Sequence, residues 1–111
     1  MDFIAHVPRD MTELLPQFLA NRRADIDRLR SALESKDWRK LQHFSERMYA
    51  VGNPYGFRQI TTFGRHLREA CAAQAEGVVQ GILDEYEEYL SKVQIIHVES
   101  EVPRPQWRAA A

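Results

Sequence analysis

Residues 46–57 read ERMYAVGNPYGF, and this stretch contains both the end of a helix and a turn. Its first half mixes charged and apolar residues, as an amphipathic helix does. Gly52, Asn53, Pro54 and Gly56 then follow within five residues, and these residue types end helices and favour turns. The stretch therefore predicts two helices joined by a tight connection, one ending near residue 51 and the next beginning near residue 57.

Apolar residues at helical spacing on both sides of this turn predict four long helices. The seam positions are Leu15, Leu19, Arg22, Ile26, Leu29 and Leu33; Trp38, Leu41, Phe44, Met48 and Val51; Ile60, Phe63, Leu67 and Cys71; and Val79, Ile82, Leu83, Tyr86, Leu90, Val93 and Ile96. Asp37 is a suitable N-cap for the second helix. Gly64 lies on the inward face of the third helix, where glycine costs about 1 kcal/mol relative to alanine, so we expect a neighbouring helix to approach closely there.

The connections between these segments are short, so neighbouring helices should pack antiparallel. No segment alternates convincingly with period two, and we expect an all-α fold, an antiparallel up-down four-helix bundle. After an irregular lead-in over residues 1–9, Asp10 and Glu13 have capping-box spacing and predict a short N-terminal helix. We expect one helical domain over residues 1–97 and a C-terminal tail over residues 98–111, which contains Trp107.

Composition limits the classes of function. The chain has 111 residues, enough for one domain, and a formal net charge of −1. That balance argues against nucleic acid or an anionic membrane as a partner chosen by bulk charge. Cys71 is the single cysteine, which excludes an internal disulfide and favours a reducing compartment. No stretch suits a signal peptide or a membrane span, so we expect a cytoplasmic protein.

One face of the second helix is polar. At about 100° per residue, His43 and Glu46 lie opposite the apolar seam and are neighbours, three residues apart. Ala50 shares that side, and Arg47 and Tyr49 flank it. From residue types alone this is an ordinary solvated helix face.

Metal and cofactor motifs are absent from the sequence. No histidine pair has metal-ligand spacing with a third candidate, so we expect no metal site. Neither a glycine-rich phosphate loop nor a nucleophile elbow is present, and we expect no cofactor.

Residues 10–97 resemble a histidine phosphotransfer (HPt) domain of bacterial phosphorelays. Members of that family have an exposed active histidine in a pattern close to H-x-[LM]-K-G-x-G-x-x-Y-G-F, and residues 46–57 are similar to it in the same register. The flanking segments 14–38 (LLPQFLANRRADIDRLRSALESKDW) and 82–93 (ILDEYEEYLSKV) resemble the family's first long helix with its turn and its last helix. The resemblance implies an HPt-like bundle with its functional surface on the second helix.

The sequence departs from the family pattern at three positions. Glu46 stands at the place of the histidine, Tyr49 at that of the lysine and Ala50 at that of the glycine. The family transfers phosphate through an imidazole nitrogen, and a carboxylate cannot form that phosphoramidate. Tyrosine does not neutralise phosphoryl charge as lysine would, and Ala50 adds a methyl group where glycine leaves room for a partner. We therefore expect no catalytic residue and no enzyme activity.

The resemblance implies a receiver domain of a response regulator or hybrid histidine kinase as the partner, bound without accepting phosphate. The matching surface comprises His43, Glu46, Arg47, Tyr49, Ala50 and Gly52. Two alternatives remain. In one, the protein is an active phosphotransfer protein with His43 as acceptor, displaced by about 5 Å along the helix from the family position. In the other, it is a helical adaptor that binds an unrelated partner through Tyr49 or the tail.

Overall fold

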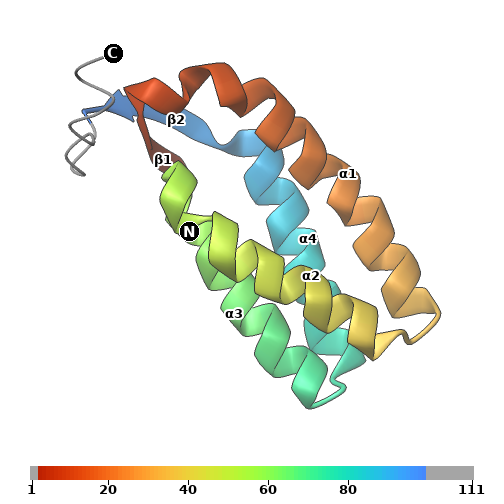
Figure 1. The fold of residues 1–111 in the computed structure, drawn as a ribbon. Coiled ribbons are helices and arrows are strands. Elements are labelled where there is room, and N and C mark those ends of the chain that lie inside the picture. The colour runs from red at the N-terminus through yellow and green to blue at the C-terminus, as the bar shows by residue number, and fades with distance from the viewer. Residues whose placement is uncertain (1–2, 100–111) are drawn as a thin grey trace.

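The computed structural model describes residues 3–99, and within them four long helices stand between two short strands. In chain order the elements are β1 (Ile4–Pro8), the 3₁₀ helix η1 (Arg9–Leu14), α1 (Leu15–Glu34), α2 (Trp38–Val51), the 3₁₀ turn η2 (Asn53–Tyr55), α3 (Arg58–Ala72), α4 (Glu76–Lys92) and β2 (Gln94–Val98). The helices pack side by side, and the strand pair lies at one end of them (Figure 1). The described chain is thus mostly helical and compact.

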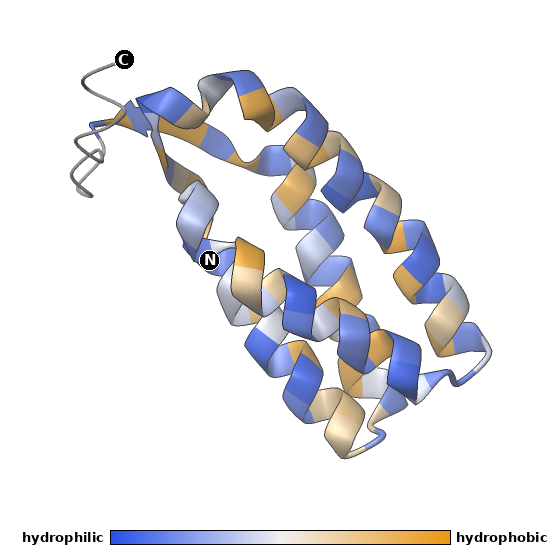
Figure 2. Ribbon diagram, in the orientation of Figure 1, coloured by the Kyte–Doolittle hydropathy of each residue, from blue (hydrophilic) through white to orange (hydrophobic). Residues whose placement is uncertain are grey.

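The predicted seams form most of the core. Apolar and polar residues are interspersed along each helix and do not form long separate blocks (Figure 2). The buried seam residues are Leu15, Ile26, Leu29, Leu41, Phe44, Met48, Ile60, Phe63, Leu67, Cys71, Val79, Leu83, Tyr86 and Leu90. Other seam residues, including Leu19, Leu33 and Trp38, pack at the edge of this core and are only partly buried. Helical periodicity therefore predicted the inward faces correctly, because burial of one stripe per helix stabilises such a fold.

The strand pair corrects the all-α prediction. β1 and β2 are parallel, with register from Ile4 opposite Gln94 to Pro8 opposite Val98. Residues 4–8 were expected in an irregular lead-in, and Ile96 was expected on the fourth helix, which instead ends at Lys92. In β1 the burial alternates, so that Ala5 and Val7 enter the core while their neighbours face outward. A five-residue alternation of this kind is too short to stand out in the sequence.

The ends of the domain differ from the expected boundaries in a second way. The segment after β1 is a 3₁₀ helix without a side-chain cap, so the capping box predicted from Asp10 and Glu13 does not form. Val98 was placed in the tail, but it is the last residue of β2. Trp107 and the rest of the expected tail beyond residue 99 lie outside the described residues.

The N-cap of α2 is confirmed. The Asp37 side chain accepts a hydrogen bond from the backbone N–H of Lys40 at 3.1 Å. This contact satisfies one of the backbone donors that the first turn of a helix leaves unpaired.

The connection between α2 and α3 is held to the rest of the fold by Gly56. This residue has φ +88°, a left-handed conformation that glycine adopts without steric cost. A side chain at Gly56 would overlap the carbonyl group of His6 and would lie 2.9 Å from the Cα of Val7. The turn therefore packs directly on the backbone of β1, and the next residue, Phe57, is fully buried.

Arg22, the charged member of the first seam, is buried as an ion pair. Its Nε lies 3.0 Å from Oδ2 of Asp25, which is also buried, and its guanidinium stands over the ring of Phe18 at 5.1 Å. A buried charge of this kind needs a close partner, because burial removes it from water.

Gly64 marks a backbone-to-backbone contact between α3 and α2, as its sequence position predicted. A methyl group on Gly64 would lie 2.8 Å from the carbonyl oxygen of Ser45 and even closer to the backbone nitrogen of Tyr49. Ser45 is itself fully buried at this contact. The two helices can approach this closely because Gly64 places no side chain between them.

We predict that Gly64→Ala lowers the free energy of unfolding by about 1–3 kcal/mol, because the added methyl group forces α2 and α3 apart. Gly81→Ala is the matched control. A methyl group on Gly81 meets nothing within 4 Å, so the better helix propensity of alanine should stabilise α4 by up to about 1 kcal/mol. Urea unfolding followed by circular dichroism measures both. Equal shifts of the two midpoints in the stabilising direction would contradict the close packing at Gly64.

Candidate functional site

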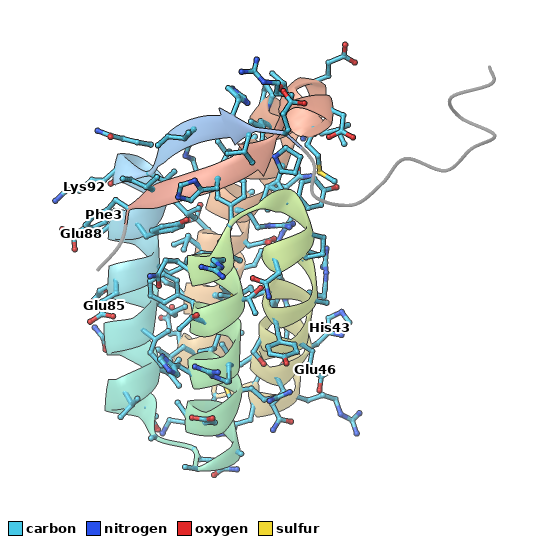
Figure 3. All side chains as sticks on the ribbon, turned by 90° about the vertical axis from the view of Figure 1, so that its left-hand side faces the viewer. Phe3, His43, Glu46, Glu85, Glu88 and Lys92 are labelled. Atoms are coloured by element: carbon cyan, nitrogen blue, oxygen red, sulfur yellow. The ribbon has the colours of Figure 1, made fainter. Side chains whose placement is uncertain are left out.

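The polar face of α2 is exposed. His43, Glu46, Arg47, Tyr49 and Ala50 are all exposed, and Tyr49 has 45% of its surface accessible. Figure 3 shows His43 and Glu46 extending outward from the same side of α2. The structure thus brings five of the six predicted surface residues together.

Gly52 does not belong to this exposed face. It is buried, and a side chain there would overlap the backbone nitrogen and hydroxyl of Thr61 on α3. The Thr61 hydroxyl also donates a hydrogen bond to the carbonyl of Tyr49 at 3.1 Å and accepts one from the backbone N–H of Asn53 at 2.8 Å. Gly52 therefore helps to join the end of α2 to α3.

Glu46 has no ion-pair partner among residues 3–99, so its carboxylate faces solvent. Its neighbour in sequence, Arg47, instead places its guanidinium 5.9 Å from the ring centre of Phe44. The ring of His43 stands edge-on to the same phenyl ring at 6.4 Å. Glu46 can accept hydrogen bonds or meet a cation from a partner, but a carboxylate offers no imidazole nitrogen for phosphate.

Arg68 completes the face from α3, although neither helical periodicity nor the family pattern singles it out. Its guanidinium lies 5.1 Å from the ring centre of Tyr49, a distance typical of cation–π contacts. The contact predicted at Gly64 could have indicated the position of Arg68, because the residue one helical turn after Gly64 also lies beside α2. We call the exposed residues His43, Glu46, Arg47, Tyr49 and Ala50, together with Arg68, the α2 face.

The other titratable candidates do not join this face. His66 is exposed on α3, and Nδ1 of His97 on β2 lies 3.2 Å from the hydroxyl of Thr12. Burial raises the pKa of the Cys71 thiol to about 11, so the thiol remains protonated and weakly nucleophilic at neutral pH. Among the residues that the structure describes, no three histidine, cysteine or acidic side chains gather where they could hold a metal ion.

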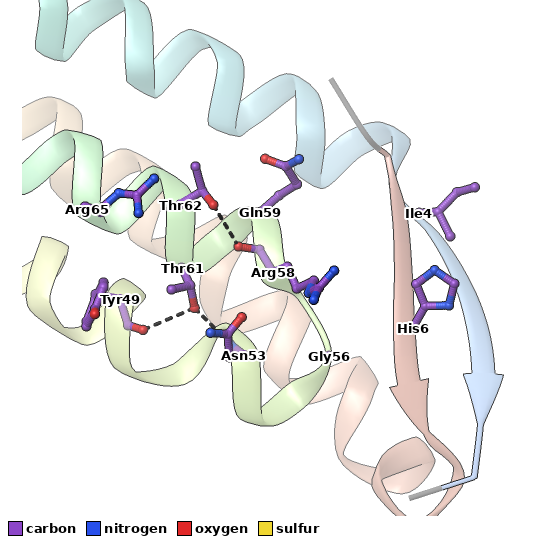
Figure 4. Close-up of a pocket in the computed structure, with 10 residues that line it drawn as sticks. All are labelled: Ile4, His6, Tyr49, Asn53, Gly56, Arg58, Gln59, Thr61, Thr62 and Arg65. Carbon is purple, nitrogen blue, oxygen red and sulfur yellow. Dashed lines mark hydrogen bonds between the residues drawn. The ribbon is translucent and has the colours of Figure 1, made fainter. Parts of the chain in front are cut away.

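A cavity opens beside the α2 face. It has a volume of about 510 Å³ and lies between β1, the end of α2, η2 and the first turns of α3 (Figure 4). Tyr49 lines it and so belongs to both features. No pattern in the sequence indicates this cavity, because its walls come from segments that are far apart along the chain.

Comparison of the chain with protein-family models, with curated proteins and with solved structures found no match. Over residues 3–99, none of the helices is both long enough and apolar enough to cross a membrane. The indications of function for the α2 face are therefore its own residues and the similarity of residues 46–57 to the HPt sequence pattern.

Proposed function

We propose that this chain is a pseudo-phosphotransfer protein, an HPt-like signalling module that binds a receiver domain in the cytoplasm without accepting phosphate. The receiver would belong to a response regulator or a hybrid histidine kinase. The proposal includes the antiparallel up-down arrangement of the four helices that is typical of HPt domains. The observation that carries it is the exposure of Glu46 on α2, at the place where the sequence pattern has its phosphoacceptor histidine.

Tyr49 supports a binding role for the α2 face. It is a large side chain with 45% exposure, and the guanidinium of Arg68 covers its ring at 5.1 Å. An aromatic ring held in place before a partner arrives loses little conformational freedom on binding, and tyrosine is common among residues that dominate interface energies. Exposed apolar area of this kind is therefore a suitable anchor for a receiver.

The surroundings of Glu46 support the absence of transfer. A phosphorylated carboxylate would be an acyl phosphate, and the lysine expected one turn along the helix to neutralise it is Tyr49 in this chain. Arg68 lies beside that ring, but its guanidinium is engaged over the ring. Phosphoryl transfer depends on positioned positive charge, so the site lacks both the nucleophile and its usual support.

His43 carries the second candidate function, phosphotransfer through a displaced histidine. Its imidazole is exposed and makes no hydrogen bond with another described residue, so it could reach an incoming phosphoryl group. It lies one turn before Glu46, about 5 Å along the helix axis. A receiver bound as in the family would present its phosphate at position 46 rather than at His43.

We predict that Tyr49→Ala weakens binding to a cognate receiver by about tenfold or more, because truncation of an aromatic anchor typically costs about 2 kcal/mol. Tyr49→Phe should keep most of the affinity. Val78→Ala is the control, since Val78 is an apolar residue with 56% exposure on α4, away from the α2 face. Isothermal titration calorimetry against receivers from the same genome measures the three affinities. If no receiver binds at high micromolar concentration, the adaptor alternative replaces the proposal.

The wild-type protein should gain no phosphate from a phosphorylated receiver. Phosphohistidine is stable in base and labile in acid, so radiolabelled gels treated at both pH extremes identify it. His43→Ala distinguishes the two candidate functions. Label that appears on the wild type and disappears in His43→Ala would establish transfer through His43 and overturn the pseudo-phosphotransfer proposal.

Restoring the family residues should restore transfer only when they are restored together. Glu46→His alone should accept little phosphate, because Tyr49 and Ala50 still differ from the family pattern. The triple variant Glu46→His, Tyr49→Lys, Ala50→Gly should accept more, as it supplies both the nucleophile and the charge. Circular dichroism controls for folding. Equal transfer by the single and triple variants would show that the supporting residues matter less than proposed.

A further inference from the structure

The cavity beside Tyr49 is cationic. Its lining residues are Ile4, His6, Tyr49, Asn53, Gly56, Arg58, Gln59, Thr61, Thr62 and Arg65. Two arginines and a histidine are among them and no carboxylate is, although the whole chain carries 16 acidic residues and a net charge of −1. Figure 4 shows that these groups come from β1, from the end of α2 with η2, and from α3.

The side chains of the two arginines and the histidine of the cavity have no partner within the described chain. Arg58, Arg65 and His6 form neither an ion pair nor a hydrogen bond through their side chains with residues 3–99. By contrast, the guanidinium of Arg30 on α1 lies 2.9 Å from Asp84 and 3.4 Å from Glu87. The cations of the cavity are therefore available to a ligand.

The two threonine hydroxyl groups of the cavity already make hydrogen bonds within the protein. The Thr61 hydroxyl joins Tyr49 and Asn53, as described above, and the Thr62 hydroxyl donates to the carbonyl of Arg58 at 3.2 Å. The remaining side-chain donors are the two guanidinium groups, the imidazole, the amides of Asn53 and Gln59 and the hydroxyl of Tyr49. A ligand that satisfies them must be rich in acceptors.

The two arginines lie at different positions along the axis of α3. Arg65 follows Arg58 by seven positions, so the two share a face of α3 and lie about 10 Å apart along its axis. A single small anion can pair closely with one of them, and a longer ligand can use both. The volume of about 510 Å³ falls within the range of small-molecule sites, about 300–1,000 Å³.

We propose that this cavity binds a small phosphorylated molecule, with its phosphate held by Arg58 or Arg65 and its organic part against Tyr49 and Ile4. Guanidinium groups suit phosphate because their planar donors bind its oxygens in pairs. The exposed side chains of Ile4 and Tyr49 offer apolar surface in the same cavity. This site is independent of receiver binding and goes beyond the proposed function.

The test titrates the full-length protein with inorganic phosphate, with adenosine monophosphate and with succinate. Heteronuclear NMR spectra at constant ionic strength report both the affinity and the residues that respond. We expect both phosphate compounds to shift the amide signals of residues 56–65 and of β1, and the nucleotide to bind more tightly than inorganic phosphate. Succinate should bind more weakly than either phosphate compound.

Two charge-removing variants and a matched control complete the test. Arg58→Gln and Arg65→Gln should together weaken binding of adenosine monophosphate by about tenfold or more, because a hydrogen bond to a charged group is typically stronger than one between neutral groups. Arg39→Gln removes one positive charge, as each single cavity variant does, from the exposed surface of α2 outside the cavity, and should leave the affinity unchanged.

Three results would overturn the proposal. The first is the absence of binding at millimolar phosphate and nucleotide. The second is an equal loss of affinity in Arg39→Gln, which would show attraction by overall charge instead of a site. The third is succinate binding as tightly as the nucleotide, which would reject a phosphorylated ligand. No receiver takes part in these measurements, so their failure is distinct from failure of the proposed function.

Discussion

The contact between α2 and α3 at Gly64 is the constraint on which both candidate surfaces depend. Because Gly64 has no side chain, the backbone of α3 reaches the backbone of Ser45 and Tyr49 on α2. This approach places Arg68 over the ring of Tyr49 and Thr61 beside the end of α2. The α2 face is therefore built by two helices, and the cavity next to it is bounded by both.

The strand pair links this pair of helices to the ends of the domain. Parallel strands cannot be joined by a tight turn and need a long crossover connection. Here residues 9–93 form that connection, so the pairing of β1 with β2 joins the two ends of the helical segment. Gly56 brings the turn between α2 and α3 against β1, and His6 and Ile4 thereby become walls of the cationic cavity. Substitution of Gly56 would disturb the turn, the sheet and the cavity together.

Tyr49 lies where the two proposed surfaces meet. It is exposed on the α2 face, where a receiver is proposed to bind, and it also lines the cavity proposed for a phosphorylated ligand. The α2 face has a carboxylate, a tyrosine and an alanine where the family pattern has its histidine, lysine and glycine. The two arginines that line the cavity, Arg58 and Arg65, lie on α3 and outside the α2 face.

The sequence by itself determined the helices and their inward faces, because one buried stripe per helix repeats over many residues and each repeat adds to the signal. It also predicted the Asp37 cap, the close approach at Gly64 and the exposure of Glu46, since each follows from local spacing. Only the tertiary structure decided the strand pair, the burial of Gly52, the position of Arg68 and the cavity. These depend on contacts between residues far apart in the chain, such as Ile4 with Gln94 and Gly56 with His6. Such contacts leave no periodic pattern, because their geometry is set by how whole elements pack and not by the neighbours of each residue.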